Sequence, residues 1–135
     1  MTYALDTNII SFLLRADETV SARWRQERIA GNTSTIPLVA YYEVKRGLIS
    51  VNATTKLKNF ERLCELLGVD DLSIEDANTA SRIYSKLRKA GRLIDDSDLL
   101  IAAQCLTRSY TLVTNNTKHF ENVDGRLLED WTVEL

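Results

Sequence analysis

The sequence predicts an α/β fold: a three-layer sandwich in which a short central parallel sheet carries helices on both faces. Short segments of strand-like composition alternate with longer segments of helical periodicity, as in sheets whose strands are joined by helical crossovers. Residues 3–5 are apolar and end at the polar triplet Asp6-Thr7-Asn8, as expected of a buried strand in a parallel sheet. The length of 135 residues and the apolar content of 44% suit one domain, residues 1–135, with a single core.

The N-terminal half predicts a strand, two helices, a second strand and two further helices. In chain order these elements are expected at residues 3–5, 9–14, 18–30, 33–36, 37–48 and 56–67. Apolar residues recur at helical spacing in the last of them, and the segment at 33–36 is rich in β-branched residues. Gly31 and Gly68 suit the left-handed position after a helix. Pro37 suits a first helical turn, so that helix is expected to start where the second strand ends.

The C-terminal half predicts three short strands and two helices. These elements are expected at residues 69–72, 74–90, 98–106, 111–114 and 130–134. Ser73 and Asp76 form a capping-box pattern before the first helix. Asp96 or Ser97 is expected to cap the second helix. The last segment, around Trp131, is expected to be an edge strand.

Composition excludes several classes of function. A net charge of −2 argues against nucleic-acid binding by a bulk positive field, although five cations within residues 82–92 form either a local basic face or an ordinary solvated helix face. No run approaches the roughly 20 apolar residues of a membrane span, and no basic region precedes the apolar residues 9–14, as a signal peptide would require. Cys64 and Cys105 are too few for a disulfide framework. We therefore expect a cytoplasmic protein with free thiols and no membrane association.

Three carboxylates are expected at one edge of the sheet. Asp6 ends the first strand, Glu43 lies on the helix after the second strand, and Asp98 opens the helix before the fourth strand. Asn115 and Asn116 follow the fourth strand. Right-handed crossovers bring the carboxyl ends of parallel strands to the same edge, where ligands bind in open α/β sheets.

Such a cluster favours a hard divalent cation. Three neighbouring carboxylates repel one another, and either protonation or a cation relieves the repulsion. Carboxylate oxygens suit Mg²⁺ or Mn²⁺, which would bind to Asp6, Glu43 and Asp98 and take further oxygens from water and phosphate. The ion would generate an attacking hydroxide and neutralise charge in the transition state. The predicted reaction is therefore metal-assisted phosphodiester hydrolysis.

Each acid also has a structural explanation when it is taken alone. Asp6 can cap the helix that follows it. Asp98 suits the dipole of a first helical turn, and Glu43 can be an ordinary surface charge of an amphipathic helix. The prediction of a site therefore depends on the joint placement of the three residues.

Four segments of the chain resemble a known family in their order and spacing. They are Leu5-Asp6-Thr7-Asn8, Tyr42-Glu43-Val44-Lys45-Arg46-Gly47, Asp98-Leu99-Leu100-Ile101-Ala102-Ala103 and Leu112-Val113-Thr114-Asn115-Asn116, with Phe120 and Trp131 after them. These segments resemble PIN domains, and among them the VapC toxins of bacterial and archaeal toxin–antitoxin pairs. The resemblance implies a Mg²⁺- or Mn²⁺-dependent endoribonuclease that cuts RNA, is inhibited by a VapB-type antitoxin and forms a homodimer.

The resemblance also implies roles for individual residues. The acids of the family correspond to Asp6, Glu43 and Asp98, and supporting hydroxyl or amide roles correspond to Thr7, Asn8 and Thr114. A partner surface of the homodimer could include Phe12, Leu13 and Leu14 with the helix at 56–67, although core packing explains most of these residues equally well.

This chain departs from the resemblance at one acid. Many relatives carry a fourth acid after the last strand, where Asn116 stands here. An amide oxygen can coordinate a metal but brings no charge, so a second ion would bind more weakly. Asp95 or Asp96 could supply that charge, although a solvated loop or a helix cap is the alternative role for both. His119 could move protons beside the site, and its alternative is a surface or packing residue.

Two other classes of function compete with a ribonuclease. An Asp after the first strand also serves haloacid-dehalogenase-like phosphatases, but those enzymes need a second Asp two residues later, where this chain has Asn8. The second alternative is a binding module that keeps the fold but does not cleave RNA. Its only support is that Asn116 stands where many relatives have an acid.

Overall fold

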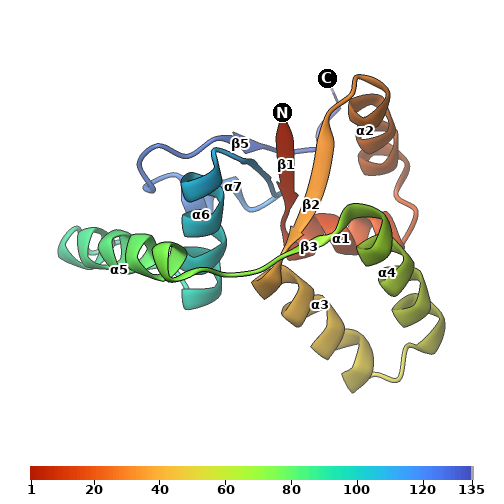
Figure 1. Ribbon diagram of the computed structural model, residues 1–135, viewed down its shortest axis with the longest axis horizontal. Helices are drawn as coiled ribbons and strands as arrows, with labels where there is room; N and C mark the ends of the chain where they lie inside the picture. Colours follow the sequence, from red (N-terminus) through yellow and green to blue (C-terminus); the bar gives the residue numbers. More distant parts are fainter. Residues whose placement is uncertain (135) are drawn as a thin grey trace.

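The structure, a computed structural model, describes residues 1–134 and contains a five-stranded parallel sheet between layers of helices (Figure 1). The strands are β1 (Thr2–Leu5), β2 (Thr33–Pro37), β3 (Val69–Asp70), β4 (Thr111–Val113) and β5 (Leu128–Glu129). Their order in the sheet is β3-β2-β1-β4-β5, and every neighbouring pair is parallel. The predicted α/β sandwich with a short parallel sheet is therefore confirmed.

The central strand of the sheet is β1. Ala4 is in register with Thr35 of β2 on one side and with Leu112 of β4 on the other. The last three residues of β1 are buried. A strand with neighbours on both sides and helices over both faces has no solvated face, so its three buried residues, Tyr3, Ala4 and Leu5, are all hydrophobic. The first site acid, Asp6, comes directly after the last residue of this strand.

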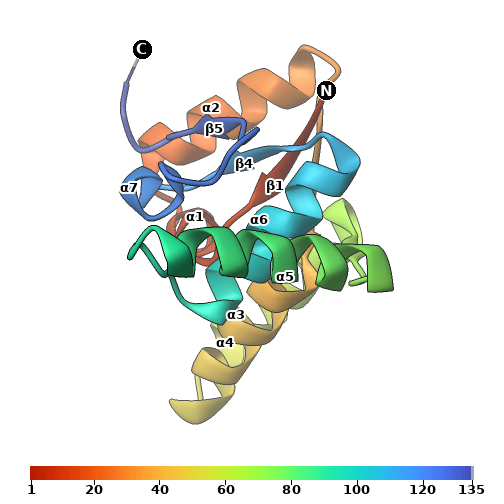
Figure 2. The ribbon, with the colours of Figure 1, turned by 90° about the vertical axis from the view of Figure 1, so that its left-hand side faces the viewer.

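Seven helices are found in the described residues. They are α1 (Thr7–Leu14), α2 (Glu18–Ile29), α3 (Leu38–Ser50), α4 (Thr54–Leu67), α5 (Ile74–Lys89), α6 (Asp96–Arg108) and α7 (Thr117–Phe120). Figure 1 shows α5 and α6 on one side of the strands and α1, α2 and α4 on the other. In Figure 2, which is turned by 90°, α3 and α4 extend together away from the sheet. The helical layers thus cover both faces of the sheet, as predicted.

Local sequence features set several helix boundaries as predicted. Ser73 and Asp76 form a reciprocal capping box at the start of α5. Gly68 follows α4 with a φ of 82°, a conformation that glycine adopts without the steric cost of a Cβ. Helix α3 begins where the second strand ends, as predicted, but Pro37 is the last residue of β2 and the N-cap of α3 and not part of the first helical turn. These boundaries depend on chemistry within a few residues, which is why the sequence alone predicts them.

The predicted edge strand at residues 130–134 is wrong. The edge strand is β5, at Leu128–Glu129, and the segment 130–134 holds turns. The indole of Trp131 is fully buried, and its ring lies 5.1 Å from the ring of Tyr3 in an edge-to-face arrangement. Its Nε1 donates to Glu129 at 3.1 Å. A large aromatic residue suits both a strand and a core contact, and here it serves the core.

The predicted cap of α6 is also wrong. The sequence favours Asp96 or Ser97, but the N-cap residue is Asp95, whose side chain makes no capping hydrogen bond. Asp96 is the first residue of the helix itself. Three consecutive residues here can each serve as a cap, and contacts with the rest of the fold decide where the helix begins.

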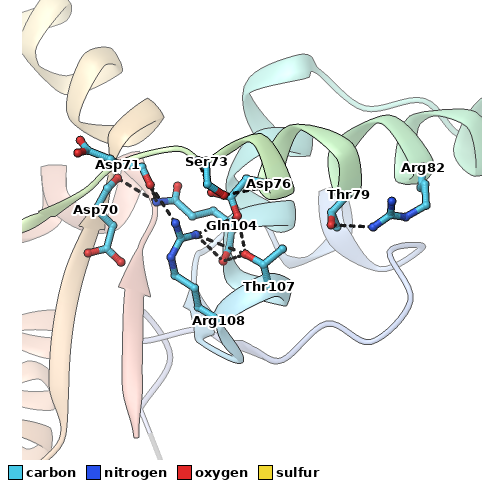
Figure 3. A network of polar contacts seen from close by, with 9 residues as sticks. All are labelled: Asp70, Asp71, Ser73, Asp76, Thr79, Arg82, Gln104, Thr107 and Arg108. Atoms are coloured by element: carbon cyan, nitrogen blue, oxygen red, sulfur yellow. Dashed lines mark hydrogen bonds and ion pairs between the residues drawn. The ribbon is translucent and has the colours of Figure 1, made fainter.

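A polar network joins α5 to α6 and to the segment after β3 (Figure 3). The fully buried carboxylate of Asp76 accepts hydrogen bonds from the hydroxyl of Thr107 at 2.5 Å and from Arg108 at 3.0 Å. Arg108 also donates to the carbonyl oxygen of Asp71 at 3.0 Å. Burial opposes ionisation of Asp76, but hydrogen bonds from Thr107, Ser73 and Arg108 outweigh it and lower its pKa. An ionised carboxylate therefore fastens α5 onto α6.

Along residues 1–134, none of the helices combines the length and the apolar composition that crossing a membrane requires. Both cysteines are free thiols, as predicted. Cys105 is buried, and burial raises its pKa to about 12, so it is inert at neutral pH. Cys64 is partly buried, and burial raises its pKa as well.

Candidate active site

Asp6 lies at the carboxyl end of β1 and caps the helix that follows. Its N–H donates to the carbonyl oxygen of Val113 in β4 at 2.9 Å, and its side chain accepts a hydrogen bond from the N–H of Thr7 at 2.8 Å. The carboxylate also accepts from the hydroxyl of Thr114 at 2.8 Å and from the amide of Asn8 at 3.3 Å. Asp6 is 4% exposed. Three donors therefore hold a nearly buried carboxylate in one orientation.

Thr7 connects this strand end to Glu43 on α3. The Thr7 hydroxyl donates to Oε1 of Glu43 at 2.9 Å. The guanidinium of Arg46, one helical turn further along, lies 3.9 Å from Oε2 of Glu43. Ala40 and Val44 are buried and hold α3 against the core. Glu43 thus reaches the start of α1 from the second turn of its own helix.

Asp98 lies in the first turn of α6, and its side chain is half-buried. Burial raises the pKa of Asp98, the negative charge of Asp6 raises it further, and His119 lowers it. Nδ1 of His119 lies 3.4 Å from Oδ2 of Asp98. The negative charge of Asp6 therefore disfavours ionisation of Asp98.

The segment after β4 is tied to the same residues. Thr114 is fully buried, and its hydroxyl donates to Asp6 while accepting from the N–H of Asn116 at 3.0 Å. Oδ1 of Asn8 accepts from the N–H of Asn115 at 3.2 Å. These hydrogen bonds fix the end of β4 against the start of α1, and they keep the surroundings of Asp6 polar and ordered.

Four residues are considered as substitutes for a fourth acid, and Asp96 lies apart from the others, in a pocket that Tyr84 of α5 and Leu99 of α6 also line. Asn116 is exposed and joins the network through its backbone N–H. Asp95 and Asp96 are exposed at the start of α6, and the charge of Asp95 contributes to the raised pKa of Asp98. His119 is 56% exposed, and its ring contacts Asp98.

The donor set suits a hard divalent cation, although the acids are linked in pairs rather than gathered in a cage. Within residues 1–134, no group of three or more His, Cys, Asp and Glu side chains is arranged to hold a metal ion. Asp6 repels Asp98, and Thr7 connects Asp6 to Glu43. Mg²⁺ usually takes one or two carboxylates and completes its shell with water and substrate phosphate. A pair of mutually repelling carboxylates therefore fits Mg²⁺ or Mn²⁺.

Two cations beside the site were not predicted from the sequence. A cleft of about 240 Å³ borders Thr7 and Glu43 and is also lined by Arg15 and Lys56. Arg15 follows α1 and Lys56 lies in α4, so their positions along the chain do not indicate a shared cleft. The packing of α1, α3 and α4 brings them together.

A protein-family model and several known proteins match this chain. The family model described as PIN domain matches residues 3–126. Ribonuclease VapC1 of Methanocaldococcus jannaschii is 35% identical over 99 residues, which cover 73% of this chain and 69% of that protein. The tRNA(fMet)-specific endonuclease VapC of Shigella flexneri is 29% identical over an alignment of 136 residues that covers 98% of this chain and 99% of that protein.

The fold also matches a solved complex. The crystal structure of VapBC2 from Rickettsia felis bound to a DNA fragment from their promoter contains a chain with a TM-score of 0.89 and 25% sequence identity, covering 97% of this chain and 99% of that chain. The parallel sheet with helices on both faces is thus that of a PIN domain. The chain belongs to the PIN-domain family and, within that family, to the VapC proteins.

Proposed function

We propose that this chain is a VapC-type endoribonuclease toxin that hydrolyses phosphodiester bonds of RNA with the help of Mg²⁺ or Mn²⁺. One observation carries the proposal: in a PIN-domain chain, Asp6 and Glu43 are far apart in the sequence but are connected through Thr7 at the carboxyl end of β1. Asp98 is the third proposed acid, and the negative charge of Asp6 raises its pKa. Two relatives are named as a ribonuclease and as a tRNA-specific endonuclease, which supports RNA as the class of substrate.

The divalent ion would be held by Asp6 and Asp98, with Glu43 beside them. When bound, such an ion lowers the pKa of water and offsets the negative charge that develops on the reacting phosphate. Thr114 orients Asp6, and Thr7 orients Glu43, through the hydrogen bonds described above. These contacts exist before RNA arrives, so little reorganisation is needed during the reaction.

A VapB-type antitoxin is the proposed partner that neutralises the toxin, and the similar Rickettsia felis chain belongs to a VapBC2 structure. Residues 12–14, which the sequence suggests as partner surface, are partly buried and pack against the core. Four apolar side chains around α3 and α4 are exposed instead: Tyr42, Ile49, Val51 and Leu66. Exposed apolar side chains of this kind suit a protein partner, either the antitoxin or a second copy in the proposed homodimer.

Cleavage of RNA tests the proposal. The purified chain is incubated with a tRNA and with an unstructured RNA in the presence of Mn²⁺, beside the Asp6→Asn variant. We expect cleavage by the wild type and a loss of more than about 100-fold in the variant, because one of the acids that hold the ion becomes a neutral amide. Circular dichroism verifies that the variant folds, since Asp6 also caps α1.

Glu61→Gln is the matched control, because it removes a carboxylate from the exposed face of α4. It should cleave RNA like the wild type. Equal cleavage by the wild type and Asp6→Asn would contradict the assigned site. Absence of cleavage by the wild type would favour a PIN-fold binding module, in agreement with the neutral amide at Asn116.

A further inference from the structure

The cleft beside Thr7 and Glu43 has no role in the proposed reaction as described so far. It lies between α1, α3 and α4 and has a volume of about 240 Å³. Its lining includes Thr7, Ser11, Arg15, Glu43, Gly47 and Lys56. The volume is below the roughly 300–1,000 Å³ of pockets that enclose a whole drug-sized ligand. The cleft is therefore of a size to bind one repeating unit of a polymeric ligand and not a whole drug-sized molecule.

Two cations in the cleft are unpaired. In the part of the chain that the structure describes, no carboxylate lies within salt-bridge distance of Arg15 or Lys56. The Arg15 guanidinium lies 4.6 Å from the centroid of the Phe12 ring, which holds it in place without neutralising it. By contrast, Lys86 on α5 pairs with Asp124. Arg15 and Lys56 thus offer positive charge to a ligand next to an acidic site.

The cleft is continuous with the candidate active site. Thr7 and Glu43 line the cleft and also form the hydrogen bond that connects α1 to α3 at the carboxylates. Glu43 is already engaged, because Oε1 accepts from Thr7 and Oε2 faces Arg46. Phosphate groups repeat along an RNA backbone. A strand whose scissile phosphate lies at the carboxylates therefore carries a further phosphate toward this cleft.

We propose that the cleft binds a backbone phosphate of the RNA substrate beside the scissile one, with Arg15 and Lys56 as its ligands. The inference rests on the proposed ribonuclease function. Guanidinium and ammonium groups are well suited to bind phosphate oxygens. Contacts of this kind fix the register of a nucleic-acid backbone without reading its sequence. The subsite thus places the strand across the acids.

Gly47 provides a test that spares the fold. It lies within α3 and lines the cleft, and a Cβ at this position would meet no atom within 4 Å. Glutamate and glutamine are both better helix formers than glycine. Gly47→Glu adds a negative charge to the cleft, and Gly47→Gln adds similar bulk without the charge. A difference between these two variants therefore reports the electrostatics of the cleft.

Affinity for RNA is measured with a labelled poly(U) strand of about 12 nucleotides, long enough to span the site and the cleft. The measurements use the Asp6→Asn background with Mn²⁺ present and a series of salt concentrations. We expect Arg15→Gln and Lys56→Gln each to raise the Kd about fivefold and to reduce the salt slope by about 0.7. Gly47→Glu should raise the Kd more than Gly47→Gln. Lys58→Gln, which removes an exposed charge two residues along α4, should change neither quantity.

The proposed subsite would be overturned by two results together. Lys56→Gln and Lys58→Gln would bind the RNA with equal affinity, and so would Gly47→Glu and Gly47→Gln. Cleft variants that keep their RNA affinity but lose binding of the antitoxin would also overturn it, because the cleft would then belong to a protein partner. If instead the proposed ribonuclease function is wrong, the chain with intact Asp6 will cut no RNA, which is a different result from a loss of RNA affinity in the cleft variants.

Discussion

At the scale of single residues, the site side chains take part in both the fold and the proposed chemistry. Asp6 caps α1 and also carries the carboxylate at the end of β1. Asp98 occupies a helical first turn, where the helix dipole favours a negative charge, yet burial and Asp6 raise its pKa. Such a raised pKa means that the folded chain disfavours the ionised form that the proposed metal site needs.

Replacement of Asp98 should therefore separate stability from activity. Asp98→Asn keeps the shape of the side chain and removes the repulsion with Asp6. Without divalent ions, we expect its melting temperature to rise by a few degrees, while RNA cleavage falls more than about 100-fold. Scanning calorimetry in EDTA and the RNA assay measure the two effects. A variant that is inactive and also less stable would indicate that Asp98 supports the fold instead.

Thr7 should act as a positioning residue for Glu43. Thr7→Val keeps the branched shape but removes the hydroxyl that donates to Glu43, so we expect kcat to fall about tenfold and the free energy of unfolding to fall by about 1 kcal/mol. Thr7→Ser retains a hydroxyl and should restore most of kcat. Similar kcat values for the two variants would show that the hydrogen bond does not position Glu43 for the reaction.

At the scale of elements, α5 depends on its polar attachment to α6. Ala80 and Leu87 of α5 are buried, while Ala77 and Tyr84, each one helical turn away from Ala80 along the helix, stay exposed. The buried carboxylate of Asp76 therefore contributes to a contact that apolar packing covers only in part. Removing the charge of Asp76 should lower the free energy of unfolding strongly, because Arg108 then loses the carboxylate that neutralises it.

The attachment should weaken in acid. The pKa of Asp76 is lower in the folded state than in the unfolded state. Its ionised carboxylate therefore stabilises the fold fully above the unfolded-state pKa of about 4, and this stabilisation is lost as the pH falls from that value through the folded-state pKa. Asp76→Asn should lower the free energy of unfolding by about 2–3 kcal/mol at neutral pH. Urea denaturation should show the difference from the wild type shrinking below pH of about 4.

Asp124→Asn serves as the control for that experiment. Asp124 also has a lowered pKa, through its contact with Lys86, but both side chains of the pair are largely exposed. Solvent screens such a pair, so this variant should change stability little at either pH. A difference between Asp76→Asn and the wild type that stays constant down to pH of about 2 would contradict the role given to the ionised carboxylate.

At the scale of the whole molecule, the parallel sheet assembles the site from distant segments. Asp6 and Thr114 follow neighbouring strands, and Glu43 comes from the helix after the strand on the other side of β1. This assembly could be anticipated from the sequence, because strand ends in a parallel sheet share one edge. The order of motifs resembling PIN domains pointed to the same family that the similar proteins show.

Features that depend on tertiary packing could not be anticipated in the same way. Trp131 has the composition of a strand residue, but its ring fills the core against Tyr3, and the edge strand forms two residues earlier than the predicted segment. The unpaired cations Arg15 and Lys56 share a cleft through the packing of three helices. The capping box of Ser73 and the Gly68 turn were predictable because their causes are local.

The central claim is that Asp6 and Asp98, with Glu43 beside them, hold a divalent ion. Calorimetric titration of Mn²⁺ into the RNA-free chain tests it most directly, with Glu61→Gln as the control. We predict binding by the wild type and by the control, and affinity reduced more than about tenfold in Asp6→Asn and in Asp98→Asn. Mn²⁺ affinity that is unchanged in both variants would contradict the claim.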